Sequence, residues 1–184
     1  MRLAIEAAKN YFKDKQVICA EIGSWLGDNA IDMLMNWSDI SKLYLVDSFE
    51  VCPDFRDAEV QQSNKEKFLT RLGTEQKASI ILERSVDASK RFDNESLDFI
   101  YIDANHTYDA IKQDIDVWTP KIKKGGIIGG HDYEYKPLDS DIRTVKKAVD
   151  EYYGKKAVKV GIVVKRIDLE NFVMEISCDW WVFL

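Results

Sequence analysis

Strand-like and helix-like hydrophobic patterns alternate five times along this chain. Short apolar runs predict strands at Val17–Ile22, Lys42–Asp47, Ala78–Leu82, Leu97–Asp103 and Gly126–Gly130. After each run, apolar residues recur at helical spacing, over Asp28–Asn36, Ala58–Leu72, Ser85–Phe92, Thr107–Trp118 and Ile142–Tyr153. Repeated strand-helix units of this kind predict an α/β protein whose parallel sheet carries helices on both faces.

The C-terminal part of the chain breaks this alternation. Two strand-like segments, Lys156–Val164 and Phe172–Phe183, are separated only by Lys165–Asn171. A parallel crossover needs a dozen or more residues, so these two strands are expected to pair antiparallel. The prediction is a seven-stranded, mostly parallel sheet that ends in an antiparallel hairpin. With 184 residues and no repeat or linker, residues 1–184 are expected to form a single domain.

The charge pattern argues against nucleic acid and membrane partners. The net charge is −6, and the densest basic run, Lys121, Lys123 and Lys124, is interpreted as a solvated helix end. No apolar stretch reaches membrane-spanning length. The first residues, Met1–Lys15, are charged and amphipathic and lack the apolar core of a secretory signal.

The three cysteines point to a reducing compartment. Cys19, Cys52 and Cys178 are odd in number and have no metal-ligand spacing. They are interpreted as reduced thiols, which predicts a cytoplasmic protein.

The two histidines of the chain follow two of the predicted strands. Asp103 and His106 come at the end of the fourth strand, and His131 and Asp132 come at the end of the fifth. Ligands bind outside the carboxyl ends of the strands in open α/β sheets. Two adjacent strands that bring Asp, His and Asp to this edge would form a polar cluster able to hold a divalent cation.

Three of these residues also have a purely structural interpretation. His106 could cap the helix that starts near Thr107, His131 could be a packed histidine bonded to a backbone carbonyl, and Asp132 could cap a turn. The joint occurrence of these residues at two strand ends favours a metal or substrate role.

The loop after the first strand, Glu21–Gly27, reads E-I-G-S-W-L-G. Glycines allow the backbone to turn tightly or to approach a ligand, although two glycines can equally be simple turn residues. Glu21 occupies the first glycine position of a dinucleotide fingerprint, where its charge would repel a pyrophosphate, which disfavours a dinucleotide oxidoreductase. Asp47 ends the second strand, where an acidic residue commonly binds a ribose diol or caps the following loop. Together these residues favour a nucleoside ligand without a diphosphate.

With these motifs the chain resembles the class I S-adenosylmethionine-dependent methyltransferases, which have a Rossmann-like fold. The E-I-G-S-W-L-G loop resembles their motif I, and Val46-Asp47 resembles their acidic ribose motif. The strand ends I-D-x-x-H-x-Y and G-G-x-x-x-x-H-D-Y resemble a small methyltransferase-domain-24-like group.

The resemblance implies S-adenosylmethionine as the cofactor and a set of residues that would bind it. Glu21 would lie near the methionine amino group, Gly23 against the cofactor backbone, Asp47 on the ribose hydroxyls and Ser85 near the adenine. The full cofactor set implied by the resemblance is Glu21, Gly23, Ser24, Gly27, Asp47, Ser48, Ser85 and Asp103.

Metal-dependent O-methyltransferases resemble the chain at both histidine motifs. By position, Asp103, His131 and Asp132 fall on their metal ligands, and His106 falls on a basic group that is often lysine. Asp103 and His106 are therefore the implied catalytic residues, with His106 as the base. Asp-His-Asp suits Mg²⁺, while the imidazole moves the preference toward Mn²⁺, Fe²⁺ or Zn²⁺. The implied reaction is metal-assisted O-methylation of a small hydroxylated acceptor such as a sugar.

Two other functions are compatible with the same residues. One is a metal-free methyltransferase with a histidine base, and the other is an inactive methyltransferase-like binding protein. Only two segments, Glu50–Asp57 and Tyr133–Asp141, are long enough to cover the site. The site is therefore expected to be open, or completed by a second copy in a homodimer.

Overall fold

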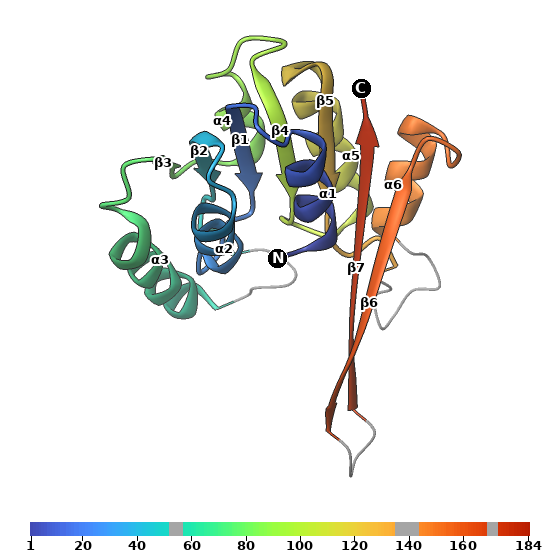
Figure 1. The fold of residues 1–184 in the computed structure, drawn as a ribbon. Helices are drawn as coiled ribbons and strands as arrows, with labels where there is room; N and C mark the ends of the chain where they lie inside the picture. Colours follow the sequence, from blue (N-terminus) through green and yellow to red (C-terminus); the bar gives the residue numbers. More distant parts are fainter. Residues whose placement is uncertain (52–56, 135–143, 169–172) are drawn as a thin grey trace.

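The computed structural model describes residues 1–51, 57–134, 144–168 and 173–184 and forms one mixed sheet flanked by helices (Figure 1). The strands are β1 (Val17–Ile22), β2 (Ile40–Val46), β3 (Ala78–Ile81), β4 (Leu97–Ile102), β5 (Ile122–Gly130), β6 (Lys159–Asp168) and β7 (Val173–Phe183). The helices are α1 (Leu3–Tyr11), α2 (Asp28–Asn36), α3 (Ala58–Leu72), α4 (Ser85–Ser89), α5 (Tyr108–Trp118) and α6 (Thr144–Tyr153), with a 3₁₀ turn η1 at Thr119–Lys121.

The sheet has seven strands in the order β3-β2-β1-β4-β5-β7-β6. Strands β1 to β5 are parallel, and β7 lies antiparallel to both β5 and β6. This topology confirms the predicted parallel sheet and its antiparallel C-terminal pair. It also places β1 and β4 next to each other, so that the loops following them meet at one edge.

Burial on both faces of the sheet follows from the two-residue period of its strands. In β4, Phe99 and Tyr101 pack into the core under α1, α2 and α3, while Ile100 and Ile102 pack under α4, α5 and α6. All four side chains are at most 2% exposed. The apolar character of this strand correctly predicts that it is covered by helices on both faces.

The hairpin of β6 and β7 reaches beyond the rest of the sheet (Figure 1). Strand β7 pairs with β5 only over Trp180–Phe183, but with β6 as far as Val173. Strand β6 begins at Lys159 rather than Lys156 and continues past Val164 to Asp168, because its backbone pairing with β7 extends through positions such as Lys165, opposite Glu175. Of the predicted connection, residues 169–171 lie outside the described residues.

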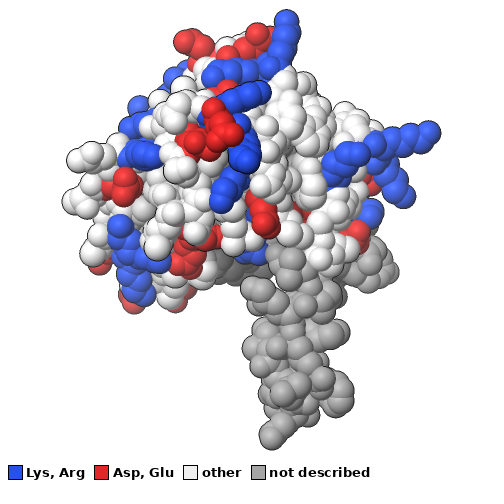
Figure 2. Space-filling model, viewed as in Figure 1, with Lys and Arg blue, Asp and Glu red and all other residues white. Residues whose placement is uncertain are grey.

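The interpretation of the basic run as a helix end is wrong for two of its three lysines. Lys121 ends the 3₁₀ turn, but β5 already begins at Ile122 and includes Lys123 and Lys124. Lys123 Nζ lies 2.9 Å from Asp98 on the adjacent strand β4, and this pairing accommodates the lysine in a strand. Across the described part of the face in Figure 2, basic and acidic side chains are mixed.

Several sequence predictions fall partly outside the described residues. Residues 52–56 and 135–143 belong to the two segments expected to cover the site, and they include Cys52 and the predicted helix start at Ile142. Cys19 and Cys178 are buried free thiols. Among the described residues, no helix is both long enough and apolar enough to cross a bilayer.

Candidate functional site

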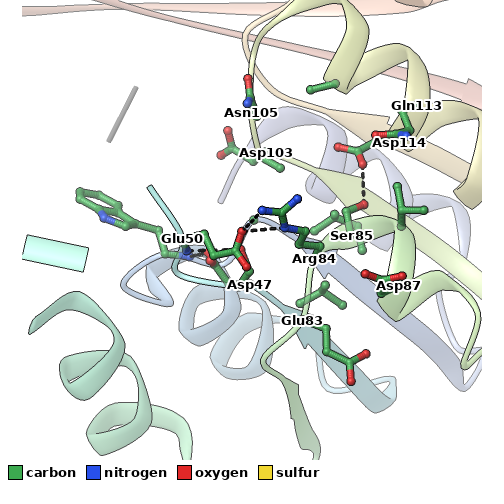
Figure 3. A pocket seen from close by; sticks show the side chains of 18 of the residues that line it. Asp47, Glu50, Glu83, Arg84, Ser85, Asp87, Asp103, Asn105, Gln113 and Asp114 are labelled. Carbon is green, nitrogen blue, oxygen red and sulfur yellow. Dashed lines mark hydrogen bonds and ion pairs between the residues drawn. The ribbon is translucent and has the colours of Figure 1, made fainter. Parts of the chain in front are cut away.

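A cavity of about 560 Å³ opens at the carboxyl edge of the parallel strands (Figure 3). The loops after β1, β2, β3 and β4 and the first turns of α5 form its walls. Of the residues expected to bind the cofactor, five line it: Gly23, Asp47, Ser48, Ser85 and Asp103. Glu21, Ser24 and Gly27 do not line the cavity. Glu21 belongs to β1, and Ser24 and Gly27 belong to the turn between β1 and α2.

Gly23 lies where the turn after β1 passes against the end of β4. Its φ of +88° lies in the left-handed region, and a Cβ at this position would lie 2.2 Å from the Asp103 carbonyl oxygen. Only glycine fits both constraints. Gly27 also has a positive φ, but a Cβ there would meet Leu72 of α3, so this glycine serves helix packing.

Asp47 has the loop-capping role that its position suggested, and its carboxylate also reaches the cavity. Its Oδ1 accepts a hydrogen bond from the Phe49 N–H, and its Oδ2 accepts one from the Trp25 N–H, both at 2.8 Å. The carboxylate therefore caps two loops, and it also lines the cavity. Burial raises the pKa of Asp47, although these backbone donors oppose the shift. Carboxylate oxygens have further lone pairs, so the carboxylate of Asp47 can still accept hydrogen bonds from ribose hydroxyls.

Glu21 is a buried carboxyl group behind the cavity. The residue is 1% exposed, and its Oε2 has no hydrogen-bond partner among the described residues. Burial, and secondarily the negative charge of Asp103, raises the pKa of Glu21 to about 8. The group is therefore mostly a neutral acid at pH 7.

This shift predicts a pH-dependent stability that Glu21→Gln removes. The folded-state pKa lies above the ordinary value of 4.5, so the stabilising contribution is present below about pH 4.5 and is lost as the pH rises through about 8. We expect Glu21→Gln to gain a few kcal/mol relative to the wild type between pH 5 and pH 8, at about 1.4 kcal/mol per pKa unit. Urea unfolding at pH 5 and pH 8 measures the free energy of unfolding of both proteins, with the exposed Glu6→Gln as the control. If the free energy of unfolding changed with pH equally in the wild type and in Glu21→Gln, the raised pKa of Glu21 would be contradicted.

A second buried carboxylate, Asp114 of α5, lines the cavity and was not singled out from the sequence. Burial raises its pKa to about 6, against a hydrogen bond from Ser85. The sequence does carry a signal for it. Asp114 lies on the same helical stripe as the buried residues Ile111, Ile115 and Trp118, where a charged side chain needs a reason to be buried.

At the ends of β4 and β5, the structure brings the predicted metal-ligand residues together. Asp103, His131 and Asp132 each offer one ligand atom, and these atoms all lie within 4.8 Å of one another. His131 Nδ1 lies 3.0 Å from Asp132 Oδ1 and 3.8 Å from Asp103 Oδ1. Two carboxylates and an imidazole this close form a donor set that fits Mg²⁺ or Mn²⁺.

His106 approaches the same cluster from the loop after β4. Its Nε2 lies 3.1 Å from Asp132 Oδ2 and 3.5 Å from Asp103 Oδ1. The helix-capping interpretation of His106 finds no support. The N-cap residue of α5 is Thr107, and the Thr107 N–H is bound by Asn105 Oδ1. The positive φ of Asp132, +56°, does place this residue in a turn.

Arg2 and Asp179 complete the surroundings of His131. Arg2 Nη1 lies 2.5 Å from His131 Nε2, and Asp179 Oδ1 lies 3.8 Å from the same nitrogen. Burial lowers the pKa of His131, but the hydrogen bond with Asp132 and the charge of Asp103 outweigh it and raise the net pKa. Burial would likewise raise the pKa of Asp132, but the hydrogen bond and charge of His131 lower it overall. The sequence could have pointed to Asp179, because a carboxylate is unusual in an otherwise apolar final strand. No sequence pattern pointed to Arg2.

The sheet order, the antiparallel β7 and the cavity at the carboxyl edge form the arrangement expected of a class I S-adenosylmethionine-dependent methyltransferase. Residues 20–133 match the sequence model of a family described as a methyltransferase domain. This match covers more than half of the chain, and the chain belongs to that family. S-adenosylmethionine is its methyl donor. A search of curated proteins found no match.

Solved structures with the same fold include methyltransferases. A putative caffeoyl-CoA O-methyltransferase from Staphylococcus aureus is 16% identical, with 100% of this chain and 84% of that chain covered and a TM-score of 0.61. The O-methyltransferase TomG from Streptomyces achromogenes, solved with S-adenosylmethionine, is 14% identical, with 98% and 78% covered and a TM-score of 0.61.

A spermidine synthase from Thermotoga maritima shares the fold as well, at 12% identity and a TM-score of 0.63. The alignment covers 97% of this chain but 58% of that protein, so this chain spans little more than half its length. At these identities the likeness shows the fold, and the acceptor has to be argued from the site.

Proposed function

We propose that this methyltransferase transfers a methyl group to a hydroxyl oxygen of a small acceptor with neighbouring hydroxyl groups, such as a sugar, and that a divalent cation assists the reaction. The observation that carries the proposal is the Asp103, His131 and Asp132 cluster, whose ligand atoms lie within 4.8 Å. Asp103 also lines the cofactor cavity, so the cluster and the cavity have this residue in common.

A cation bound by these three residues would hold two adjacent acceptor oxygens and lower the pKa of the hydroxyl that is methylated. Asp47 and Gly23 position the cofactor in the cavity. Asp103 orients the acceptor because it borders both the cavity and the cluster. Methyl transfer from a sulfonium is an in-line displacement, so alignment of the acceptor oxygen with the methyl group is the main task of these side chains.

His106 is the proposed general base. Its Nε2 lies between the carboxylates of Asp103 and Asp132, 3.5 and 3.1 Å away. After accepting the hydroxyl proton, the imidazolium would be stabilised by both negative charges. A proton-accepting group at this position removes the need for hydroxide from solvent.

A metal-free methyltransferase that uses the same base is the second candidate. The Arg2 guanidinium, 2.5 Å from His131 Nε2, favours it because a cation already neutralises part of the carboxylate charge. Removal of metal distinguishes the two candidates.

The test is methyl transfer from labelled S-adenosylmethionine to acceptors with two neighbouring hydroxyls, compared with analogues that carry one. We expect turnover with the paired hydroxyls only. We expect His106→Gln to lower kcat about a hundredfold, since positioned bases contribute about 10² to 10⁴, with the Kd for S-adenosylhomocysteine little changed.

The pH profile of the His106→Gln variant provides the control. Its rate should recover toward that of the wild type as the pH rises, because hydroxide from solvent then replaces the missing base. An unchanged kcat would remove His106 from the mechanism. Equal turnover of single-hydroxyl acceptors would contradict the proposed acceptor class.

A further inference from the structure

Arg2, the residue before α1, contacts His131 on the side of the ring that faces away from the metal-ligand cluster. His131 Nδ1 lies 3.0 Å from Asp132 Oδ1, so this nitrogen faces the cluster. The other ring nitrogen, Nε2, lies 2.5 Å from Arg2 Nη1. Arg2 therefore bonds a candidate metal ligand directly, and the metal-assisted reaction proposed above gives this arginine no role.

The direction of this hydrogen bond is fixed by chemistry. A guanidinium group has only donors and stays protonated in proteins, so His131 Nε2 must be the acceptor. A neutral imidazole has one acceptor nitrogen and one N–H, which places the ring proton of His131 on Nδ1. From Nδ1 this proton can be donated to Asp132 Oδ1. In this arrangement, the nitrogen that faces the cluster has no lone pair to offer a cation.

Binding of a cation at the cluster needs the opposite tautomer of His131. A metal ligand supplies a lone pair, so Nδ1 must lose the ring proton and Nε2 must carry it. An Nε2–H group cannot face the donors of Arg2. The hydrogen bond from Arg2 and a metal bond at Nδ1 therefore exclude each other, because they require the single ring proton in different places.

Asp179 of β7 is placed to accept the Nε2–H group of this second tautomer. Its Oδ1 lies 3.8 Å from His131 Nε2, and the residue is 1% exposed. The Ala4 N–H donates to Oδ2 of this carboxylate at 2.9 Å, and the Tyr101 hydroxyl donates to Oδ1 at 3.2 Å. These two contacts fix the carboxylate, and an oxygen that accepts one hydrogen bond can accept a second. Metal-ligating histidines commonly donate their other N–H to a carboxylate in this way.

We propose that Arg2 and Asp179 alternate at His131 Nε2 and thereby control cation binding: Arg2 excludes the cation, and Asp179 holds the tautomer that binds it. Both are positioning residues, since each acts through His131. The inference rests on the proposed function, because Arg2 has a cation to exclude only if Asp103, His131 and Asp132 form a metal site.

Calorimetric titration of the metal-free protein with Mn²⁺ tests this competition without an assay of activity. Arg2→Met should bind Mn²⁺ at least about tenfold more tightly than the wild type, because the cation no longer has to displace a charge-assisted hydrogen bond. Lys13→Met is the matched control, since it removes the same charge from an exposed position after α1. Its Kd for Mn²⁺ should stay within about twofold of the wild-type value.

The position of the ring proton distinguishes this competition from simple charge repulsion. In nitrogen-15 NMR spectra of the imidazole rings, recorded at a pH where both rings are neutral, wild-type His131 should carry its proton on Nδ1. The chain has two histidines, so the signals lost in His106→Gln identify those of His131 by elimination. In Arg2→Met the Nε2–H tautomer should appear, because Asp179 then provides the acceptor. Loss of charge alone would leave the proton on Nδ1.

The outcomes separate this inference from the proposed function. An Arg2→Met variant with the wild-type Kd for Mn²⁺, or with the His131 proton still only on Nδ1, overturns the inference and leaves the proposed function standing. A wild-type His131 that already carries its proton on Nε2 does the same. If neither the wild type nor Arg2→Met binds Mn²⁺, both the inference and the proposed metal assistance are overturned.

Discussion

Replacing Asp132 with asparagine is expected to lower kcat for methyl transfer at least about a thousandfold, while the Kd for S-adenosylhomocysteine stays within about twofold. Metal assistance contributes several kcal/mol, which corresponds to a rate effect of this size. Asp132 supplies one of three ligand atoms, and its carboxylate also faces His106. It does not line the cofactor cavity, so binding of the nucleoside should persist. Asparagine tolerates the φ of +56° at this position, so the backbone is preserved.

Metal removal should reproduce the effect of Asp132→Asn in the wild-type protein. We expect treatment with a chelator to abolish turnover, and Mg²⁺ or Mn²⁺ to restore it in the wild type but not in the variant. Direct titration with Mn²⁺ gives a readout without activity: the wild type should bind the ion and Asp132→Asn should bind it far more weakly. The exposed Asp109→Asn serves as the control. Full activity after chelation would instead support the metal-free enzyme with His106 as base.

The fold was predictable because its determinants are local. The two-residue and 3.6-residue periods, together with the short C-terminal connection, were sufficient to predict seven strands and an antiparallel end. The exact ends of the helices and strands were harder to predict from the sequence. Strand β5 starts at Ile122 rather than Gly126 because Lys123 pairs with Asp98 on the neighbouring strand. A partner 25 positions away in sequence does not show in the local pattern.

The site was predictable where strand ends alone define it. Asp103, His131 and Asp132 follow strands that the sequence identifies, and parallel strands bring such residues to one edge. Arg2 reaches His131 only because α1 packs across the sheet, and the two residues are 129 positions apart. Asp114 was missed for a different reason. Its core-facing position on α5 signals a buried carboxylate, but the pattern does not show that this carboxylate lines a cavity.

Gly23→Ala is expected to lower the free energy of unfolding by about 3 kcal/mol or more and to lower kcat/KM at least about a hundredfold. The left-handed φ of +88° costs an alanine about 1–2 kcal/mol. The new Cβ would also lie 2.2 Å from the Asp103 carbonyl oxygen, so the turn after β1 and the end of β4 must separate. Asp103 belongs to both the cavity and the metal-ligand cluster, and a displacement of about 1 Å there can cost a hundredfold in rate.

Gly154→Ala separates the two contributions to this effect. Gly154 has a similar φ of +78° at the end of α6, but a Cβ there meets nothing within 4 Å. Gly154→Ala should lower the free energy of unfolding by only about 1 kcal/mol, the cost of an alanine in the left-handed backbone conformation. It should leave cofactor binding and turnover unchanged. Urea unfolding and titration with S-adenosylhomocysteine measure both variants. If Gly23→Ala behaved like Gly154→Ala, the close approach of the first loop to Asp103 would not be what holds the two halves of the site together.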